Sequence, residues 1–149
     1  MNVERSTGII THVDFGCLFD DGTRFPIPEV TPFRLTPNMV NAFGVTSVEG
    51  VFMKSAIIVL KVIRESRTQS LLITIMEAML YDSVFQKVKE KRSAKEILAT
   101  VKGRMEGRLL GIKSVQGVSG TREQCVFLVR EAMSVRNLGQ MHLGWMPWL

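Results

Sequence analysis

The fold class is decided by residues 46–65, which read TSVEGVFMKSAIIVLKVIRE. Thr46 and Glu49 have the spacing of a capping box, in which a hydroxyl and a carboxylate each satisfy a free backbone N–H group at a helix start. The helix that follows, from Ser47 to about Glu65, is apolar nearly all round between Ala56 and Leu60. Such a helix lies in the middle of a larger structure. We therefore predict a mainly α fold built around it.

Further helices are predicted on both sides of this central one. Thr36 is an N-cap followed by proline at the first helical position, and Gly44 supplies a stop. Ser93 and Glu96 form a second capping box. The predicted helices run from Pro37 to Phe43, from about Gln69 to Tyr81, from Ser93 to a far end weakened by Gly103 and Gly107, and from about Thr121 to Met133.

Each of the three longer flanking helices carries an apolar stripe. The stripes are Leu71, Leu72, Ile75, Met76, Met79 and Leu80; Ile97, Leu98, Val101 and Met105; and Cys125, Val126, Leu128, Val129 and Ala132. A stripe that contains methionines is either core or the wall of a ligand groove. We interpret all three as core.

The N-terminal part of the chain predicts extended structure, so the fold class is mainly α with a short β hairpin. Ile9–Val13 reads as a strand, Cys17–Phe19 is a second short apolar run, and Asp20-Asp21-Gly22 is a turn signal. Three prolines exclude a helix through Thr23–Arg34. We expect an extended loop there, pinned by the side chains of Phe25, Ile27 and Phe33.

Composition indicates a globular intracellular protein of one ordinary domain, or a piece of a larger one. The chain has 149 residues, of which 46% are hydrophobic and 22% charged, enough apolar surface for a real core. No apolar run is long enough to predict a transmembrane segment, and Met1–Thr7 lacks a signal-peptide core. Cys17 and Cys125 have neither zinc-site nor disulfide-framework spacing.

The net charge of +5 lies in one segment. Between Lys87 and Arg108 there are eight basic residues and three acidic ones, and the rest of the chain balances at 11 against 11. A basic segment can attract nucleic acid or an acidic partner. No aromatic residue is interleaved with these charges to stack on bases. We interpret the segment as a solvated linker and helix face.

A candidate metal ligand follows the predicted strand. Asp14 comes directly after Val13, and Phe15-Gly16 follows at once. Kinase-type phosphoryl-transfer enzymes place a magnesium-binding aspartate in this context, and the glycine lets the next segment turn away. The alternative is a strand that ends in ordinary Asp-x-Gly turn chemistry. His12 alternates to the face opposite Val13, where packing or hydrogen bonding is favoured over catalysis.

Three stretches, in order, resemble the phosphatidylinositol 3-kinase-related protein kinases. His12–Phe19 resembles the metal-binding motif, Pro32–Phe52 the end of the activation loop with the helices after it, and the C-terminal tail the small FATC domain. Gln140–Trp145 with Pro147 is most similar to the ATR-type DNA-damage checkpoint kinases. Gly16 departs from the asparagine more usual in the family.

The resemblance implies a serine/threonine kinase that uses ATP and magnesium in the nucleus. Asp14 is the expected magnesium ligand, because a hard cation prefers carboxylate oxygen, and Phe15 would pack under it. Residues 16–36 would shape the peptide-substrate groove, ending at Pro32, Phe33, Arg34, Leu35 and Thr36. Arg34 would either anchor the loop end through a salt bridge or meet an acidic group.

The resemblance also implies a division of the chain and its partners. Residues 1–92 would belong to the catalytic domain, 93–116 to a helical linker and 117–149 to the FATC domain, with Gly144, Trp145, Pro147 and Trp148 at its tip. The two tryptophans would pack on the lobe, enter a membrane interface or meet a partner, and packing is favoured. Expected partners are protein substrates and a regulatory subunit or activator protein, with DNA contacted only indirectly.

Several kinase parts are absent from this sequence. It holds no glycine-rich phosphate loop, no nucleotide-binding lysine on a strand and no Asp-Arg-His catalytic loop. We expect those parts N-terminal to Met1 in a complete kinase, and we expect the 149-residue chain to be inactive alone. The alternative function is a non-catalytic interaction module that binds a regulator through the helical and FATC region. A lipid kinase is a weaker alternative, because lipid kinases lack the FATC tail.

Overall fold

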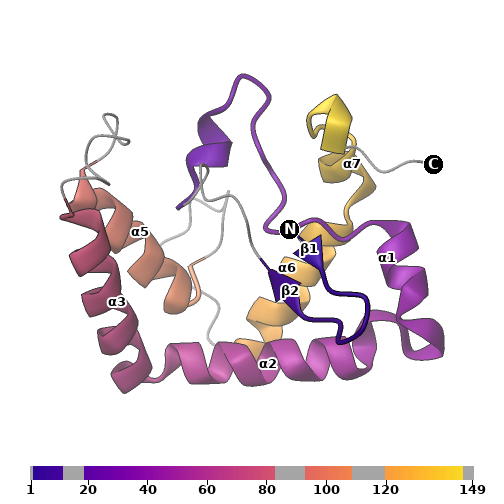
Figure 1. Cartoon of the computed structure of the whole chain (residues 1–149), viewed down its shortest axis with the longest axis horizontal. Helices are drawn as coiled ribbons and strands as arrows, with labels where there is room; N and C mark the ends of the chain where they lie inside the picture. The colour runs from indigo at the N-terminus through magenta and orange to yellow at the C-terminus, as the bar shows by residue number, and fades with distance from the viewer. Residues whose placement is uncertain (1, 12–18, 83–92, 109–119, 146–149) are drawn as a thin grey trace.

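The computed structural model describes residues 2–11, 19–82, 93–108 and 120–145 and is mainly helical, as predicted (Figure 1). Its α-helices are α1 (Pro37–Ala42), α2 (Val51–Arg64), α3 (Ser66–Leu80), α5 (Ala94–Met105), α6 (Thr121–Met133) and α7 (Val135–Leu138). Short 3-10 turns are η1 (Asp21–Arg24), η2 (Gly44–Glu49) and η3 (Leu143–Trp145). The predicted loop over 111–120 lies outside the described residues except for Gly120.

Helix α2 is the element that the longer helices contact. The prediction that it lies in the middle of the structure is wrong, because none of its residues is fully buried and Ile58 and Val59 are more than half exposed. It lies along one edge of the molecule in Figure 1 and packs against α6, α3 and α5. The α3–α5 pair stands at the C-terminal end of α2, and α1 stands near its N-terminal end. The three longer flanking helices therefore all contact one long helix.

The predicted start of the central helix is wrong. Ser47 has φ 47° and ψ −140°, so the chain between Gly44 and Glu49 forms a kinked 3-10 turn, and α2 begins at Val51 without a side-chain cap. The Thr46 hydroxyl lies against Gly50, where any Cβ would collide with it. Thr46 is thus used for packing on the turn, and the predicted capping box with Glu49 does not form.

The corner between α2 and α3 is made by one residue. Glu65 has extended backbone angles (φ −64°, ψ 132°) and is both the C-cap of α2 and the N-cap of α3. Helix α3 therefore begins at Ser66, three residues before its predicted start at Gln69. No capping side chain marks this start, so local sequence signals do not reveal it.

The starts of three other helices were predicted correctly from local sequence signals. Thr36 and Pro37 open α1 as predicted, and Gly44 follows its end with a positive φ of 73° that suits glycine. The capping box of Ser93 and Glu96 is present in both directions and opens α5. Helix α6 spans Thr121–Met133, the predicted bounds.

The β hairpin is present, with a partner strand that the sequence did not indicate. Strand β2 (Ile10–Thr11) falls within the predicted strand and pairs antiparallel with β1 (Asn2–Val3). Gly8, with φ 72°, donates its N–H to the Glu4 carbonyl at 2.8 Å and closes the connection. Cys17 and Leu18 lie outside the described residues.

The best-buried cluster lies where α6 meets α2. Leu35, Cys125, Val129 and Ala132 are buried, and Phe52, Met53, Ala56, Ile57 and Leu60 of α2 pack against them. Val126, predicted to join this core, is exposed. Ile97 and Met105 of α5 are buried as predicted, and Leu80 of α3 is buried as well.

The predicted core stripe of α3 is only half correct. Leu72 and Met76 are half-buried on the side of Leu80, whereas Leu71, Ile75 and Met79 are exposed. The stripe covers about half of the helix circumference, and α5 meets only one edge of it.

Candidate functional site

The predicted metal-binding motif is not among the described residues. His12, Asp14, Phe15 and Gly16 all lie in the stretch 12–18, which the structure does not describe. Among the residues that it does describe, no group of three or more histidine, cysteine, aspartate or glutamate side chains could hold a metal ion. The magnesium ligand Asp14 therefore stays a prediction from the sequence.

The loop that follows this motif is described from Phe19 onward, and its first fixed point is Asp20. The Asp20 carboxylate Oδ2 lies 2.7 Å from Arg104 Nη2 of α5. The Asp20 carbonyl accepts hydrogen bonds from the Thr23 backbone N–H at 3.1 Å and from the Thr23 hydroxyl at 2.7 Å. The predicted Asp-Asp-Gly turn is present as η1.

The middle of the loop lies against the C-terminal tail. Phe25, Pro26, Ile27 and Glu29 line a pocket of about 340 Å³ together with Met141 and His142. The Thr31 hydroxyl also donates to Met141 Sδ at 3.8 Å. Phe25 and Ile27 are about half exposed, so they hold this part of the loop less firmly than predicted.

The end of the loop is anchored in the core. Among the residues predicted to form it, Leu35 and Thr36 are buried, whereas Pro32 and Arg34 are half-buried. The Phe33 ring lies 6.3 Å from the Phe52 ring of α2, centroid to centroid. Leu35 belongs to the α2–α6 cluster. The loop end is thus fixed by apolar packing on α2 and α6.

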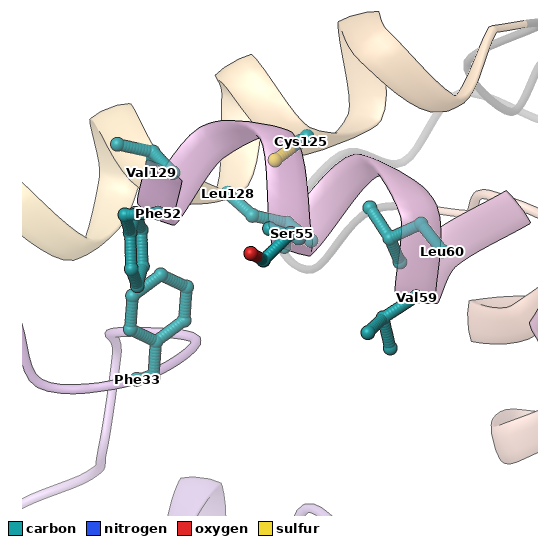
Figure 2. A pocket seen from close by; sticks show the side chains of 9 residues that line it. Phe33, Phe52, Ser55, Val59, Leu60, Cys125, Leu128 and Val129 are labelled. Atoms are coloured by element: carbon teal, nitrogen blue, oxygen red, sulfur yellow. The ribbon is translucent and has the colours of Figure 1, made fainter. Parts of the chain in front are cut away.

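An apolar pocket of about 440 Å³ adjoins the loop end (Figure 2). Phe33 comes from the loop, and the other lining residues come from α2 (Phe52, Ser55, Ala56, Val59 and Leu60) and α6 (Cys125, Leu128 and Val129). The Cys125 thiol donates to Met53 Sδ at 3.2 Å. Burial raises the pKa of the Cys125 thiol, so this wall of the pocket carries no charge at neutral pH.

The predicted FATC tip is described only in part. Turn η3 runs from Leu143 to Trp145, and the Gly144 N–H donates to His142 Nδ1 at 3.2 Å. Pro147 and Trp148 lie outside the described residues. Packing of the two tryptophans on the lobe therefore remains a prediction.

In the described part of the basic segment, three of the four basic residues are exposed as predicted. Lys95, Lys102 and Arg108 are exposed on or just beyond α5. Arg104 is only 30% exposed and pairs with Asp20, which is 84 positions away in the sequence. Sequence reasoning missed this pair, because no local pattern connects charges so far apart. Lys87–Arg92 lie outside the described residues.

Comparison with known proteins establishes the family. The family described as phosphatidylinositol 3- and 4-kinase matches residues 1–88, and the FATC domain matches residues 119–149. The first match covers more than half of the chain, so this protein belongs to the phosphatidylinositol 3- and 4-kinase family and carries a FATC domain.

Curated relatives place the chain near one group of kinases. It is 35% identical to the serine/threonine-protein kinase ATR of Arabidopsis thaliana over 97% of this chain. It is 38% identical to the serine/threonine-protein kinase MEC1 of Kluyveromyces lactis and 35% identical to the protein kinase rad3 of Schizosaccharomyces pombe, each over 95% of this chain. The predicted resemblance to ATR-type kinases is confirmed. The chain spans only 5–6% of the length of these relatives.

Proposed function

We propose that this chain is the C-terminal part of an ATR-type serine/threonine protein kinase that works in DNA-damage checkpoint signalling in the nucleus. The observation that carries the proposal is the order of the two family matches, kinase at residues 1–88 and FATC at residues 119–149, within relatives that match almost the whole chain. In the part of the chain that the structure describes, no helix is long and apolar enough to cross a membrane.

In the complete kinase, the reaction is transfer of the ATP γ-phosphoryl group to a serine or threonine hydroxyl of a protein substrate. Catalysis of this kind rests on positioning and electrostatic stabilisation. The role proposed for Asp14 is to hold magnesium, which neutralises charge on the ATP phosphates. The role proposed for residues 19–36 is to shape the substrate groove, and their anchoring by Asp20, Leu35 and Thr36 supports it.

The division of the chain proposed from the sequence assigns 1–92 to the catalytic domain, 93–116 to a linker and 117–149 to the FATC domain. The linker and FATC regions would receive a regulatory subunit or an activator protein. The contacts of Met141 and His142 with the proposed substrate loop support regulation through the tail. DNA would be met only through such partners.

The isolated chain is proposed to be inactive, because its sequence holds no phosphate loop, nucleotide lysine or catalytic base. A γ-phosphate transfer assay compares the 149-residue chain with the complete kinase, each with and without Asp14→Ala. We expect no turnover from the isolated chain and loss of at least about a hundredfold in kcat for the complete kinase variant. Turnover of the isolated chain that depends on Asp14 would contradict the inactivity, and an active Asp14→Ala kinase would contradict the ligand assignment.

A further inference from the structure

The last turn of α5 is a polar junction at which three other segments converge. Its members are Asp20 of the loop, Arg64 of α2, Arg104 and Glu106 at the end of α5, and Gln124 of α6. We call these five residues the α5 junction. Segments from the proposed catalytic, linker and FATC regions all contribute to it.

Two of the contacts satisfy backbone carbonyls at the end of α5. Gln124 Nε2 donates to the Arg104 carbonyl at 3.1 Å, and Arg64 Nη2 donates to the Glu106 carbonyl at 2.9 Å. The Arg104 carbonyl also accepts the Gly107 N–H at 3.0 Å, and a cation such as Arg64 is favoured beside the end of a helix. Gln124 is only 4% exposed, so its side chain is buried beside the end of α5. These contacts fix the backbone that carries the Arg104 side chain.

The third contact ties the loop to this fixed point. Arg104 Nη2 and Asp20 Oδ2 are 2.7 Å apart, a short charge-assisted hydrogen bond. Both side chains are less than one-third exposed, at 30% and 29%, so solvent screens the pair less than a surface ion pair. The pair therefore fixes the position of Asp20 relative to α5.

The loop backbone at Asp20 has an unusual conformation that needs such support. Phe19 and Asp20 are consecutive non-glycine residues with positive φ, 55° and 67°. Aspartate tolerates this conformation, whereas a bulky residue such as Phe19 adopts it only when its surroundings hold it there. The chain then turns through η1, and the Glu29 N–H returns to the Gly22 carbonyl at 2.9 Å. Release of Asp20 would loosen the start of this segment, whereas its Phe25–Glu29 part keeps its contacts with the C-terminal tail.

We propose that Arg104 is a positioning residue for phosphoryl transfer, which holds the substrate loop against the linker helix through Asp20. This inference rests on the proposed kinase function. Arg104 does not itself contact substrate or nucleotide: it acts on the loop that would receive the protein substrate. Movement of α5 or α6 at the junction changes how firmly the loop is held, which links the FATC helix to substrate binding.

The test uses the complete kinase with Arg104→Gln, Asp20→Asn and the double variant. Asparagine tolerates positive φ almost as well as aspartate, so Asp20→Asn removes the charge while it keeps the backbone conformation. We expect each single variant to raise the peptide-substrate KM about three- to tenfold, as for loss of a partly buried charged contact. The KM for ATP stays unchanged. The double variant is no worse than either single variant, because both remove the same contact.

A matched control and a second measurement complete the design. Lys102→Gln removes an exposed charge from the same helix and should leave both KM values unchanged. Hydrogen–deuterium exchange of the peptide covering residues 20–29 should become faster in Arg104→Gln and Asp20→Asn. If Arg104→Gln does not yield a folded kinase, Arg104→Lys replaces it, because lysine keeps the charge without the planar fork. We expect a smaller rise of the peptide KM for that variant.

The failure of this inference differs from failure of the proposed function. If the complete wild-type protein transfers no phosphate, or if Asp14→Ala leaves transfer intact, the kinase proposal fails, and hydrogen exchange still reports whether Arg104 holds the loop. An active wild-type kinase whose Arg104 and Asp20 variants match it in peptide KM and in exchange overturns the positioning role. Additive effects of the two substitutions, or a parallel rise in the KM for ATP, overturn it as well.

Discussion

The α2–α6 interface and the outer face of α3 are both rich in apolar residues, but the first is buried and the second is exposed to solvent. Leu35 is 3% exposed and Val129 is 4% exposed in the interface, whereas Leu71 is 60% and Ile75 is 49% exposed on α3. The α6 and α3 stripes were both predicted to be core from apolar periodicity, whereas Leu35 was named only from the family resemblance. The difference lies in what faces them, because α6 covers one side of α2, whereas α5 covers only one edge of the α3 stripe.

Apolar periodicity therefore identifies the apolar face of a helix, but it does not show which element, if any, packs against that face. The apolar stripe of α3 spans half of the helix circumference. A single neighbouring helix cannot cover so wide a stripe. Burial energy follows the area removed from water and not the residue type. The following predictions for the 149-residue chain rest on that distinction.

The largest expected effect compares the same substitution in the two regions. Leu35→Ala should lower the free energy of unfolding by about 2–5 kcal/mol, because it opens a cavity in the buried cluster. Leu71→Ala, the matched control, should change it by less than about 0.5 kcal/mol. Urea unfolding followed by circular dichroism measures both. Equal losses would show that the outer face of α3 is packed in solution.

The next expected effect is a pH dependence of stability that comes from Cys125 in the buried α2–α6 interface. Burial raises the pKa of Cys125, so the folded chain keeps a proton that the unfolded chain loses above its ordinary thiol pKa of about 8.5. The free energy of unfolding should therefore be unaffected by this group below that pH and fall above it, by up to about 1.4 kcal/mol per pH unit.

Cys125→Ala is the control for the pH effect, because it removes only the buried thiol. Urea unfolding from pH 7 to 10 should give a steeper decline for the wild type than for the variant. A decline of the same slope in both chains would mean that the Cys125 thiol is not desolvated in solution.

A smaller effect concerns the helix that covers the inner edge of α3. Ser93→Ala removes the side-chain cap of α5 and should cost about 1 kcal/mol of unfolding free energy. Ser70→Ala, on exposed α3, should cost less than about 0.5 kcal/mol, because its hydroxyl only returns to the Ser66 carbonyl of its own helix. Thermal unfolding compares the two. If the Ser70 variant is less stable than the Ser93 variant, the cap does not control the stability of the α3–α5 pair.

The smallest effect is expected from a charge on the exposed stripe. Ile75→Lys should leave the free energy of unfolding within about 0.5 kcal/mol of the wild type, because lysine can extend into water from that position. A loss above about 1 kcal/mol would indicate that the chain buries this face, for instance against a second copy. Analytical ultracentrifugation of the wild type and the variant distinguishes self-association from a change of fold.

Much of the helical fold could be predicted from the sequence. Much less of the candidate functional site could be predicted. The bounds of α6 and the start of α5 follow from the sequence because their signals are local. The two capping-box patterns had different outcomes: Ser93 and Glu96 form the box, whereas Thr46 packs on Gly50. The motif alone does not decide between these outcomes, because a competing contact can take the hydroxyl.

Within the candidate site, the sequence analysis named the end of the loop. It did not predict that the start of the loop is held at Asp20. Pro32–Thr36 was named from the family resemblance, and the structure buries Leu35 and Thr36 within it. Arg104 had been counted only as one of eight basic residues of a solvated segment. Its pairing with Asp20 depends on the path of the whole chain between them, which no local pattern encodes.

The approximate positions of the helices and the family resemblance follow from local sequence signals, because caps, prolines and apolar periods act over a few residues. The tertiary structure alone decided which half of the α3 stripe is buried, where α2 begins, and that the loop at Asp20 is held by Arg104. These features depend on the positions of segments far apart in the chain. Packing and charge pairing across such separations exist only once the chain has folded.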